Sequence, residues 1–409
     1  MSDTPGPPDR KPRIVLVAPN ISKRMGGEAA KALQIFQGLT AMGYDAVQVT
    51  HARVREEMQA LLPGANIRYV EDGPAQVFLF RSRLNWPLMF VGAWLLHREA
   101  VRAAKDHGAD LVHFTSPISP SLPYFRFPGV PVVIGPLNGN ILHPPALMER
   151  ETRAKRIGAA LLVPAQKILG ALFPGKKRAT LLVAGGERTE KALAIGGCRK
   201  AQMIATLDSG VDQALAASPR LTHSGVNPRF VFAGRLIRYK GCDLAIRALH
   251  HAPGATLDVI GDGAERAALE ALAAREGLAD RVRFLGWVEA GAPLFAQLRA
   301  YRAFVFPTLA EANGIVVQEA MMLGLPVIAV DWGGPALLLT QETGILVEPA
   351  SEAEIALSVG RAMNRLMNEP EAAERLSANA RAEAERAGFS WPDLLNAWAA
   401  IYDRVAAST

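Results

Sequence analysis

The chain has 409 residues, of which 50% are hydrophobic and 21% charged, so it is too apolar for a disordered protein and too long for one small core. We expect two globular domains and, because 45 Lys and Arg outnumber 39 Asp and Glu, anionic partners such as nucleotides, phospholipid surfaces or nucleic acid. The 2 cysteines, Cys198 and Cys242, exclude a disulfide framework and a four-thiolate zinc site, and we predict both to be buried small hydrophobic residues.

The sequence shows no segment typical of a membrane-spanning or secreted protein. No apolar run reaches the roughly 20 uncharged residues that a spanning helix needs. Residues 1–10 are rich in Pro, Asp and Gly and lack the apolar region of a secretory signal. We therefore expect a cytoplasmic protein.

Short apolar runs alternate with segments of helical period, which predicts parallel strands covered by helices on both faces. The expected strands of the first half span residues 13–18, 46–49, 111–114, 131–134, 180–183 and 202–206. Those of the second half span residues 230–233, 256–260, 282–285, 304–306 and 326–330. The expected helices span residues 28–42, 88–105, 242–250, 264–275 and 316–323, and helical periodicity returns after residue 351. The fold class is thus α/β, with two Rossmann-like doubly wound domains.

A linker is expected at residues 214–229, where both periodicities are lost and Pro219, Gly225 and Pro228 occur. We place an N-terminal domain at residues 1–213 and a second domain at residues 214–390. Two such domains would face a cleft, and folds of this class bind ligands at the carboxyl ends of their strands.

Two carboxylates flank a predicted strand-to-helix turn in the second domain. A buried strand ends at Phe306, Glu311 lies in the following loop, Gly314 permits close approach of the backbone, and Glu319 falls in the first turns of the next helix. Free N–H groups at such a helix start can hold a phosphate, while a carboxylate beside them can accept hydrogen bonds from sugar hydroxyls. The alternative is that both are solvated charges favoured by the helix dipole.

A second strand of this domain, ending at Ala233, runs into a loop that carries Arg235 and Lys240. A guanidinium fork and a mobile ammonium group together suit a diphosphate leaving group as its negative charge develops. Solvated surface charges remain the alternative reading of this pair.

Glycine pairs follow two predicted strands. Gly26 and Gly27 open the first expected helix, and Gly261 and Gly263 repeat a strand-to-glycine turn in the second half. Neither is the GxGxxG fingerprint, so a nicotinamide enzyme is disfavoured. The sequence has no Asp-x-Asp, no phosphate-binding GxxxxGK[ST] and no HExxH, so we expect no metal and no cofactor.

Taken together, Gly26-Gly27, Gly234-Arg235 with Lys240-Gly241, Gly261-Asp262-Gly263, and Glu311 with Glu319 closely resemble the family 4 retaining glycosyltransferases of GT-B architecture. The resemblance spans nearly the whole chain and includes Gly210-Val211-Asp212 before the linker and the last helix, from Ser390-Trp391 to Tyr402. In such enzymes that helix, here residues 391–409, completes the N-terminal domain.

The resemblance implies a metal-independent, retaining glycosyltransferase of the hexosyltransferase type, acting in polysaccharide or glycolipid biosynthesis. Its partners would be a nucleotide diphosphate sugar, which is a substrate and not a cofactor, and a glycan or lipid-linked acceptor. Arg235 and Lys240 would bind the diphosphate, Glu311 the donor sugar and Glu319 the ribose hydroxyls. Further donor contacts are expected from Gly26, Gly27, Gly234, Gly261, Asn313, Gly314 and Ile315.

The sequence departs from the family pattern in two places. On the acceptor side it retains His113 but has Thr115 where a second histidine often stands, and on the donor-sugar side Asn313 replaces an aromatic residue. The loop with Asn138 and Asn140 resembles a Gly-Pro-x-Gly-Gly loop that would line the acceptor side. The sequence fits equally a reading of His113 as a core histidine bonded to backbone. It leaves Trp287 open as a base neighbour or a packing residue.

Residues 149–178 combine many Lys and Arg with an apolar stretch, which is typical of a segment that lies on an anionic membrane. The N-terminal domain would then dock on the inner membrane face to reach a lipid-linked acceptor. The alternative is a core-packed helix with a solvated basic face. Nucleic acid is disfavoured, because no zinc-ligand set or aromatic RNA motif accompanies the charge.

Two other functions remain open from the sequence alone. The same cleft could serve a sugar-nucleotide epimerase or a phosphorolytic enzyme, or a sugar-nucleotide-binding protein without catalysis. Intact Arg235, Lys240, Glu311 and Glu319 argue against the loss of catalysis.

Overall fold

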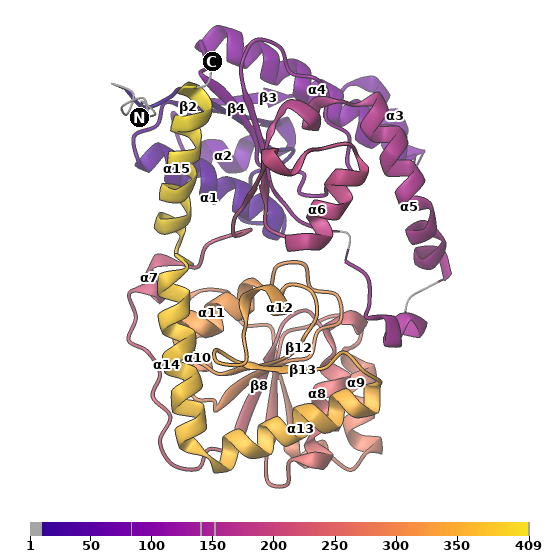
Figure 1. Cartoon of the computed structure of the whole chain (residues 1–409), viewed down its shortest axis with the longest axis vertical. Coiled ribbons are helices and arrows are strands. Elements are labelled where there is room, and N and C mark those ends of the chain that lie inside the picture. The colour runs from indigo at the N-terminus through magenta and orange to yellow at the C-terminus, as the bar shows by residue number, and fades with distance from the viewer. Residues whose placement is uncertain (1–9, 83, 140, 151–152, 408–409) are drawn as a thin grey trace. The chain divides into compact units, whose positions relative to one another are not determined.

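The computed structural model describes residues 10–82, 84–139, 141–150 and 153–407. The chain forms two compact units, each an α/β structure with one parallel sheet (Figure 1). Unit 1 comprises Met1–Asn140, Gly158–Asp208 and Pro392–Thr409, and unit 2 comprises Ile141–Ile157 and Ser209–Trp391. The expected fold class of two doubly wound parallel sheets is confirmed for each unit.

Unit 1 contains a sheet of seven parallel strands in the order β3-β2-β1-β4-β5-β6-β7. The strands are β1 (Ile14–Val17), β2 (Ala46–His51), β3 (Ile67–Val70), β4 (Leu111–Phe114), β5 (Val132–Leu137), β6 (Thr180–Val183) and β7 (Met203–Ala205). The direction of winding reverses between β1 and β4, which pair directly with Ile14 beside Leu111. Such a reversal leaves a crevice at the carboxyl ends of the two strands, where doubly wound folds bind ligands.

Helices cover both faces of this sheet. They are α1 (Gly27–Ala41), α2 (Arg55–Leu61), α3 (Pro74–Arg81), α4 (Asn85–His107), α5 (Arg153–Leu172, in this unit from Gly158 on), α6 (Gly186–Ile195) and α15 (Trp391–Ala407, in this unit from Pro392 on). Helix α4 packs on β1 to β4, and its Ala100 and Ala103 have no exposed surface. Helix α15 packs so tightly on α1 that a Cβ atom at Gly38 would lie 2.2 Å from Leu395.

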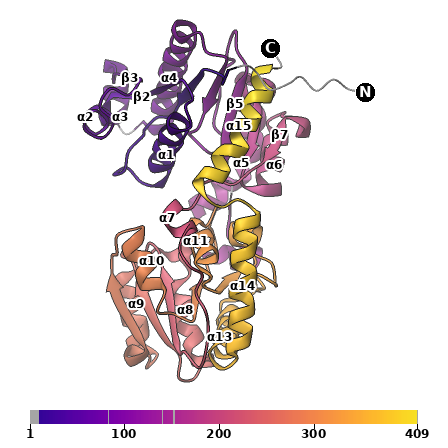
Figure 2. The same ribbon diagram turned by 90° about the vertical axis from the view of Figure 1, so that its left-hand side faces the viewer.

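Unit 2 repeats the same winding with six parallel strands in the order β10-β9-β8-β11-β12-β13. The strands are β8 (Arg229–Ala233), β9 (Thr256–Ile260), β10 (Val282–Gly286), β11 (Ala303–Phe306), β12 (Val327–Val330) and β13 (Ile345–Val347). The helices are α7 (Gln213–Ala216), α8 (Cys242–Ala248), α9 (Arg266–Arg275), α10 (Ala292–Leu298), α11 (Ile315–Leu323), α12 (Pro335–Leu338), α13 (Glu352–Asn368) and α14 (Pro370–Arg386). Winding reverses between β8 and β11, and α14 lies against α11 (Figure 2).

Every strand expected from apolar runs is present, with ends that differ by a few residues. Two strands were missed: β3, in which only Val70 is buried, and β13, which has only three residues. Helices α2, α3, α6, α10 and α12 were also missed. Residues 217–228 are irregular, as expected of a linker, although α7 occupies its start. Cys198 and Cys242 are buried, as predicted.

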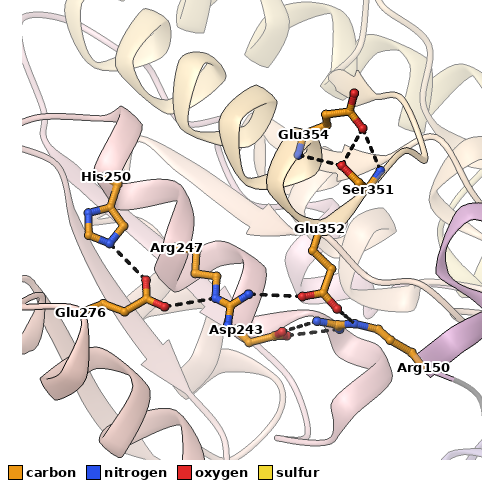
Figure 3. Close-up of polar contacts among 8 residues, drawn as sticks. All are labelled: Arg150, Asp243, Arg247, His250, Glu276, Ser351, Glu352 and Glu354. Carbon is orange, nitrogen blue, oxygen red and sulfur yellow. Dashed lines mark hydrogen bonds and ion pairs between the residues drawn. The ribbon is translucent and has the colours of Figure 1, made fainter.

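The sequence boundary at residue 213 differs from the observed division in the segment Ile141–Ile157, which packs with unit 2. Figure 3 shows the reason: Arg150 forms ion pairs with both Asp243 and Glu352, and its side chain is only 6% exposed. Glu352 also pairs with Arg247 at 3.2 Å. This charge network ties the segment to unit 2, because separating the partners would leave unpaired charges in a partly desolvated place.

Within the described residues, no helix is both long and apolar enough to cross a lipid bilayer.

Candidate active site

The loop after β8 is held against the loop after β11 by backbone contacts. The Tyr239 carbonyl accepts hydrogen bonds from the Leu309 N–H at 2.8 Å and the Thr308 hydroxyl at 3.2 Å. A Cβ atom at Gly241 would lie 2.1 Å from the Pro307 carbonyl oxygen, so only glycine allows this approach. The two loops therefore meet where the winding of unit 2 reverses.

This contact brings together two residues that the sequence singled out separately. The Lys240 ammonium forms an ion pair with the Glu311 carboxylate, and the two side chains are 18% and 17% exposed. The Lys240 nitrogen also lies 5.2 Å from the centre of the Phe306 ring, a cation–π contact. A partly desolvated lysine is thus fixed at the carboxyl end of β11.

Helix α11 begins at Ile315, four residues after Glu311. Gly314 precedes it with φ of 85°, a left-handed conformation that favours glycine. The Val317 and Gln318 N–H groups both donate to the Gly314 carbonyl. The amides of Ile315 and Val316 have no acceptor within the helix, so the start of α11 offers N–H groups to an anion.

The loop before α11 is supported from two sides. The Gly334 N–H donates to the Glu311 carbonyl at 2.7 Å, and the Asn313 amide donates to the Ser209 hydroxyl at 3.1 Å. Asn313, Gly314 and Ile315 therefore lie together beside Glu311, as the sequence suggested. Ser209 was missed, because no pattern marks a lone serine.

Glu319, in the second turn of α11, is partly buried, and its side chain makes no hydrogen bond or ion pair within the described residues. Burial, and secondarily the Asp212 carboxylate, raise the pKa of Glu319 from 4.5 to about 7. A carboxylate held without a partner is available to accept hydrogen bonds from ligand hydroxyls. Asp212 is the N-cap of α7. The sequence placed it in the motif Gly210-Val211-Asp212 but did not predict that it lies near Glu319.

The other donor-side residues of unit 2 are arranged less closely. Arg235 is exposed and forms no ion pair in the part of the chain that the structure describes. A Cβ atom at Gly261 would lie 2.0 Å from the Gly234 carbonyl oxygen, so these two glycines pack on each other and shape the loop. Trp287 is 74% exposed, so it is not a packing residue.

In unit 1, Gly26 and Gly27 lie at the start of α1. Gly26 has φ of 84°, and a Cβ atom at either glycine would meet no atom within 4 Å. The next residue, Glu28, accepts hydrogen bonds from the Ser116 hydroxyl at 2.5 Å and the Ile118 N–H at 3.1 Å. The start of α1 is thus open around the glycines and tied to the loop after β4.

The geometry contradicts an acceptor contact by the His113 ring. The side chain has no exposed surface; its Nε2 donates to the Gly135 carbonyl at 2.7 Å and its Nδ1 accepts from the Tyr402 hydroxyl at 2.8 Å. Burial lowers the pKa of His113 to about 4, so the ring is neutral and this pattern of donor and acceptor follows. His113 is the core histidine of the alternative reading.

The remaining acceptor-side residues are also enclosed. Thr115 is 1% exposed, and its N–H donates to the Val17 carbonyl at 3.0 Å. Asn138 is 1% exposed, and its side-chain oxygen accepts from Arg188 at 2.8 Å. Both residues support the loops after β4 and β5, and they expose too little surface for extensive contact with an acceptor substrate. Asn140 lies outside the described residues.

No three His, Cys, Asp or Glu side chains among the described residues gather as a metal site would require. Metal independence remains a prediction.

The fold is that of GT-B glycosyltransferases, as comparison with solved structures shows. The structure of Anabaena Alr3699/HepE in complex with UDP and glucose superimposes with a TM-score of 0.61 over 95% of this chain and 99% of that one, at 18% identity. A glycosyltransferase from Rickettsia africae ESF-5 gives a TM-score of 0.67 over 98% and 100%, at 14% identity.

Sequence comparison is more specific for unit 2. Residues 217–383 match the family described as glycosyl transferases group 1, and this part of the chain is a domain of that family. The lipopolysaccharide core biosynthesis glycosyltransferase LpsD of Rhizobium meliloti is 36% identical over 171 residues, which cover 42% of this chain and 48% of LpsD. The chain thus spans about half the length of that relative.

Proposed function

We propose that the protein transfers a sugar from a nucleoside diphosphate sugar to a glycan or lipid-linked acceptor, with retention at the anomeric carbon and without a metal ion. The observation that supports this most is the Lys240–Glu311 pair beside the open start of α11, at the carboxyl ends of β8 and β11. A basic group, free backbone N–H groups and a carboxylate are the three parts needed to hold a diphosphate and a sugar together.

The departing diphosphate explains why Lys240 and Arg235 would be needed at this site. As the bond to the anomeric carbon breaks, positive charge develops on the sugar and negative charge on the diphosphate. Lys240, with the N–H groups of Ile315 and Val316, would stabilise that negative charge, and Arg235 would swing in from solvent. Glu311 would release Lys240 to the phosphate and accept hydrogen bonds from hydroxyls of the donor sugar.

Glu319 would bind the ribose. Its carboxylate lies on α11 four residues after Ile315 and has no partner among the described residues. Two vicinal hydroxyls would satisfy it and compensate for the burial that raises the pKa of this carboxyl group. The predicted approach of Gly26 and Gly27 to the diphosphate is part of this proposal.

Donor binding is tested by measuring the melting temperature of the protein with UDP, GDP, ADP or TDP. Each value is compared with the melting temperature in the presence of the corresponding monophosphate. A ligand at about 100 times its dissociation constant adds about 2.7 kcal/mol to the free energy of unfolding. We expect one diphosphate to raise the melting temperature by several degrees and its monophosphate by less. In Lys240→Ala that difference should disappear, whereas equal shifts by both nucleotides in the native protein would oppose the diphosphate site.

Product analysis separates transfer from the other reactions of a sugar nucleotide. A transferase needs an acceptor for stoichiometric turnover, whereas an epimerase converts the donor by itself. Accumulation of an isomerised sugar nucleotide with donor alone would contradict transfer.

We also propose that unit 1 docks on an anionic membrane surface on the cytoplasmic side, through α5. Leu161, Ile168 and Leu172 are 60%, 59% and 66% exposed, and the exposed Lys167 lies on the same helix. A helix of this kind can place apolar side chains among lipids and basic ones near their head groups. Co-sedimentation with anionic vesicles at low salt tests the idea. Binding should be lost in Ile168→Glu, and absence of binding by the native protein would remove the proposal.

A further inference from the structure

A cavity of about 570 Å³ lies within unit 1, in the place that corresponds to the charged site of unit 2. It is lined by residues at the carboxyl ends of three neighbouring strands: Val17 and Pro19 at the end of β1, His51 at the end of β2, and Phe114 and Ser116 at the end of β4. Helices α3 and α4 and the segment 117–125 form its other walls. The cavity therefore occupies the crevice where the winding of unit 1 reverses.

The walls of this cavity are mainly apolar. Helix α4 contributes Leu88, Met89 and Leu96, and the segment after β4 contributes Tyr124 and Phe125. Phe80 of α3 also lines the cavity and is 72% exposed, so it lies at the opening. An enclosed apolar space at a ligand-binding edge favours a ligand with a substantial hydrocarbon part.

Arg53, Asp72 and Gln76 of the lining have polar partners, and His51 is neutral. Arg53 pairs with Asp72 at 3.1 Å, and the Gln76 side-chain oxygen accepts from the Gly73 N–H at 3.0 Å. His51 is 5% exposed, and burial lowers its pKa, so it is neutral. Its Nδ1 makes no hydrogen bond within the described residues and lies 3.9 Å from Asp72. The walls thus present no unpaired charge to an ionic ligand.

The size of the cavity suits a chain rather than a small solvent molecule. An apolar cavity of about 150 Å³ is enough to hold benzene, so 570 Å³ has room for a hydrocarbon chain of more than about ten carbons. One side of the cavity also reaches the polar edge of the sheet, since Ser116 lines it and donates to Glu28 at the start of α1.

We propose that this cavity binds the aliphatic chain of an amphiphilic acceptor, and leaves its polar head at the strand ends beside Ser116 and the start of α1. This inference rests on the proposed transfer reaction and assigns the lipid-linked class, rather than a free glycan, to the acceptor. The chain would contribute most of the binding free energy by burial, while the head would be presented for reaction.

Alkyl β-D-glucosides with methyl, hexyl, octyl and decyl chains, used below their micelle concentrations, test the site by calorimetry without any donor. Because each buried methylene contributes to transfer from water, affinity should rise about fourfold per added methylene while the chain stays inside the cavity. Equal affinity for the methyl and decyl compounds would overturn the proposal.

The substitution Gly92→Leu on α4 tests whether the alkyl chain binds inside the cavity. Gly92 lines it, and a Cβ atom there would lie 3.8 Å from Gln76 and 3.9 Å from His51, which are ordinary contact distances. The longer side chain should fill the space and weaken decyl glucoside binding by more than tenfold. Val91→Leu, on the same helix but outside the lining, should bind within twofold of the native protein. Equal affinity of the two variants would show that the chain binds elsewhere.

Nucleotide binding distinguishes failure of this inference from failure of the proposed function. Both variants should show the same UDP, GDP, ADP or TDP shift as the native protein, because neither Val91 nor Gly92 is among the residues proposed to contact the nucleotide. Nucleotide binding without chain-length dependence would overturn the lipid acceptor alone. Chain-length dependence without any nucleotide shift would instead overturn the transfer reaction.

Discussion

The two units share one strand order but differ in what they present where the winding reverses. In unit 2 the carboxyl ends of β8 and β11 carry Lys240 and Glu311, followed by Glu319. In unit 1 the corresponding ends of β1 and β4 border an apolar cavity, and His113 is enclosed in the core. The fold determines where a ligand can bind, and the side chains after each strand determine whether that ligand is charged or apolar.

Lys240→Ala is expected to have the largest effect on this contrast. It removes the cation from a partly desolvated place and leaves Glu311 without its partner. Turnover of the sugar nucleotide should fall about 10²- to 10³-fold, as when one preorganised donor to a developing negative charge is removed. Steady-state kinetics measures this.

The matched control is Arg365→Ala, which removes an exposed pair with Glu369 in the same unit, with side chains 53% and 56% exposed. It should change turnover less than twofold. Similar losses in both variants would mean that Lys240 has no special role.

Glu319→Gln should have an effect of intermediate size. At pH 8 it should raise the free energy of unfolding but weaken binding of the diphosphate. Below pH 4.5 the Glu319 carboxyl group is protonated in both the folded and the unfolded chain, so its raised pKa does not change the stability. Above pH 7 the group is charged in both states, and the folded protein bears the full cost of burying that charge. Between these pH values the destabilisation grows as the pH rises. The variant should therefore be more stable than the native protein by about 1–3 kcal/mol at pH 8 and nearly equal to it at pH 4.5. Urea unfolding at the two pH values measures this.

The same variant should bind the diphosphate about tenfold more weakly at pH 8, because a charged acceptor of two hydroxyls has been lost. Affinity of the native protein should rise from pH 6 to pH 8 more steeply than that of the variant, as Glu319 loses its proton. Parallel pH profiles would remove Glu319 from the ribose contact.

Tyr402→Phe should have the smallest effect and tests the neutral core of unit 1. It removes the hydroxyl that donates to His113 Nδ1 and leaves that buried nitrogen without a partner. The free energy of unfolding should fall by about 1–2 kcal/mol, with kcat and the acceptor KM unchanged for the folded enzyme. A changed acceptor KM would return His113 to the acceptor side.

The sequence predicted both sheets because buried parallel strands form continuous apolar runs, of which Ala303–Phe306 and Val327–Val330 are examples. It also predicted that Lys240 and Glu311 lie at one edge, since both follow a strand. It could not predict their pairing, which depends on the approach of Gly241 to Pro307. It missed the cavity for a similar reason, because its walls come from α3, α4 and distant loops whose apolar residues look like ordinary core.

The division of the chain has a consequence for synthesis and for protein engineering. The polypeptide passes from one unit to the other after Asn140, Ile157, Asp208 and Trp391. Trp398 and Tyr402, which have no exposed surface and belong to unit 1, are translated only after all of unit 2. Unit 1 therefore cannot complete its folding on the ribosome until the last helix has been made. Neither unit can be produced as one contiguous fragment without losing a segment that packs with it.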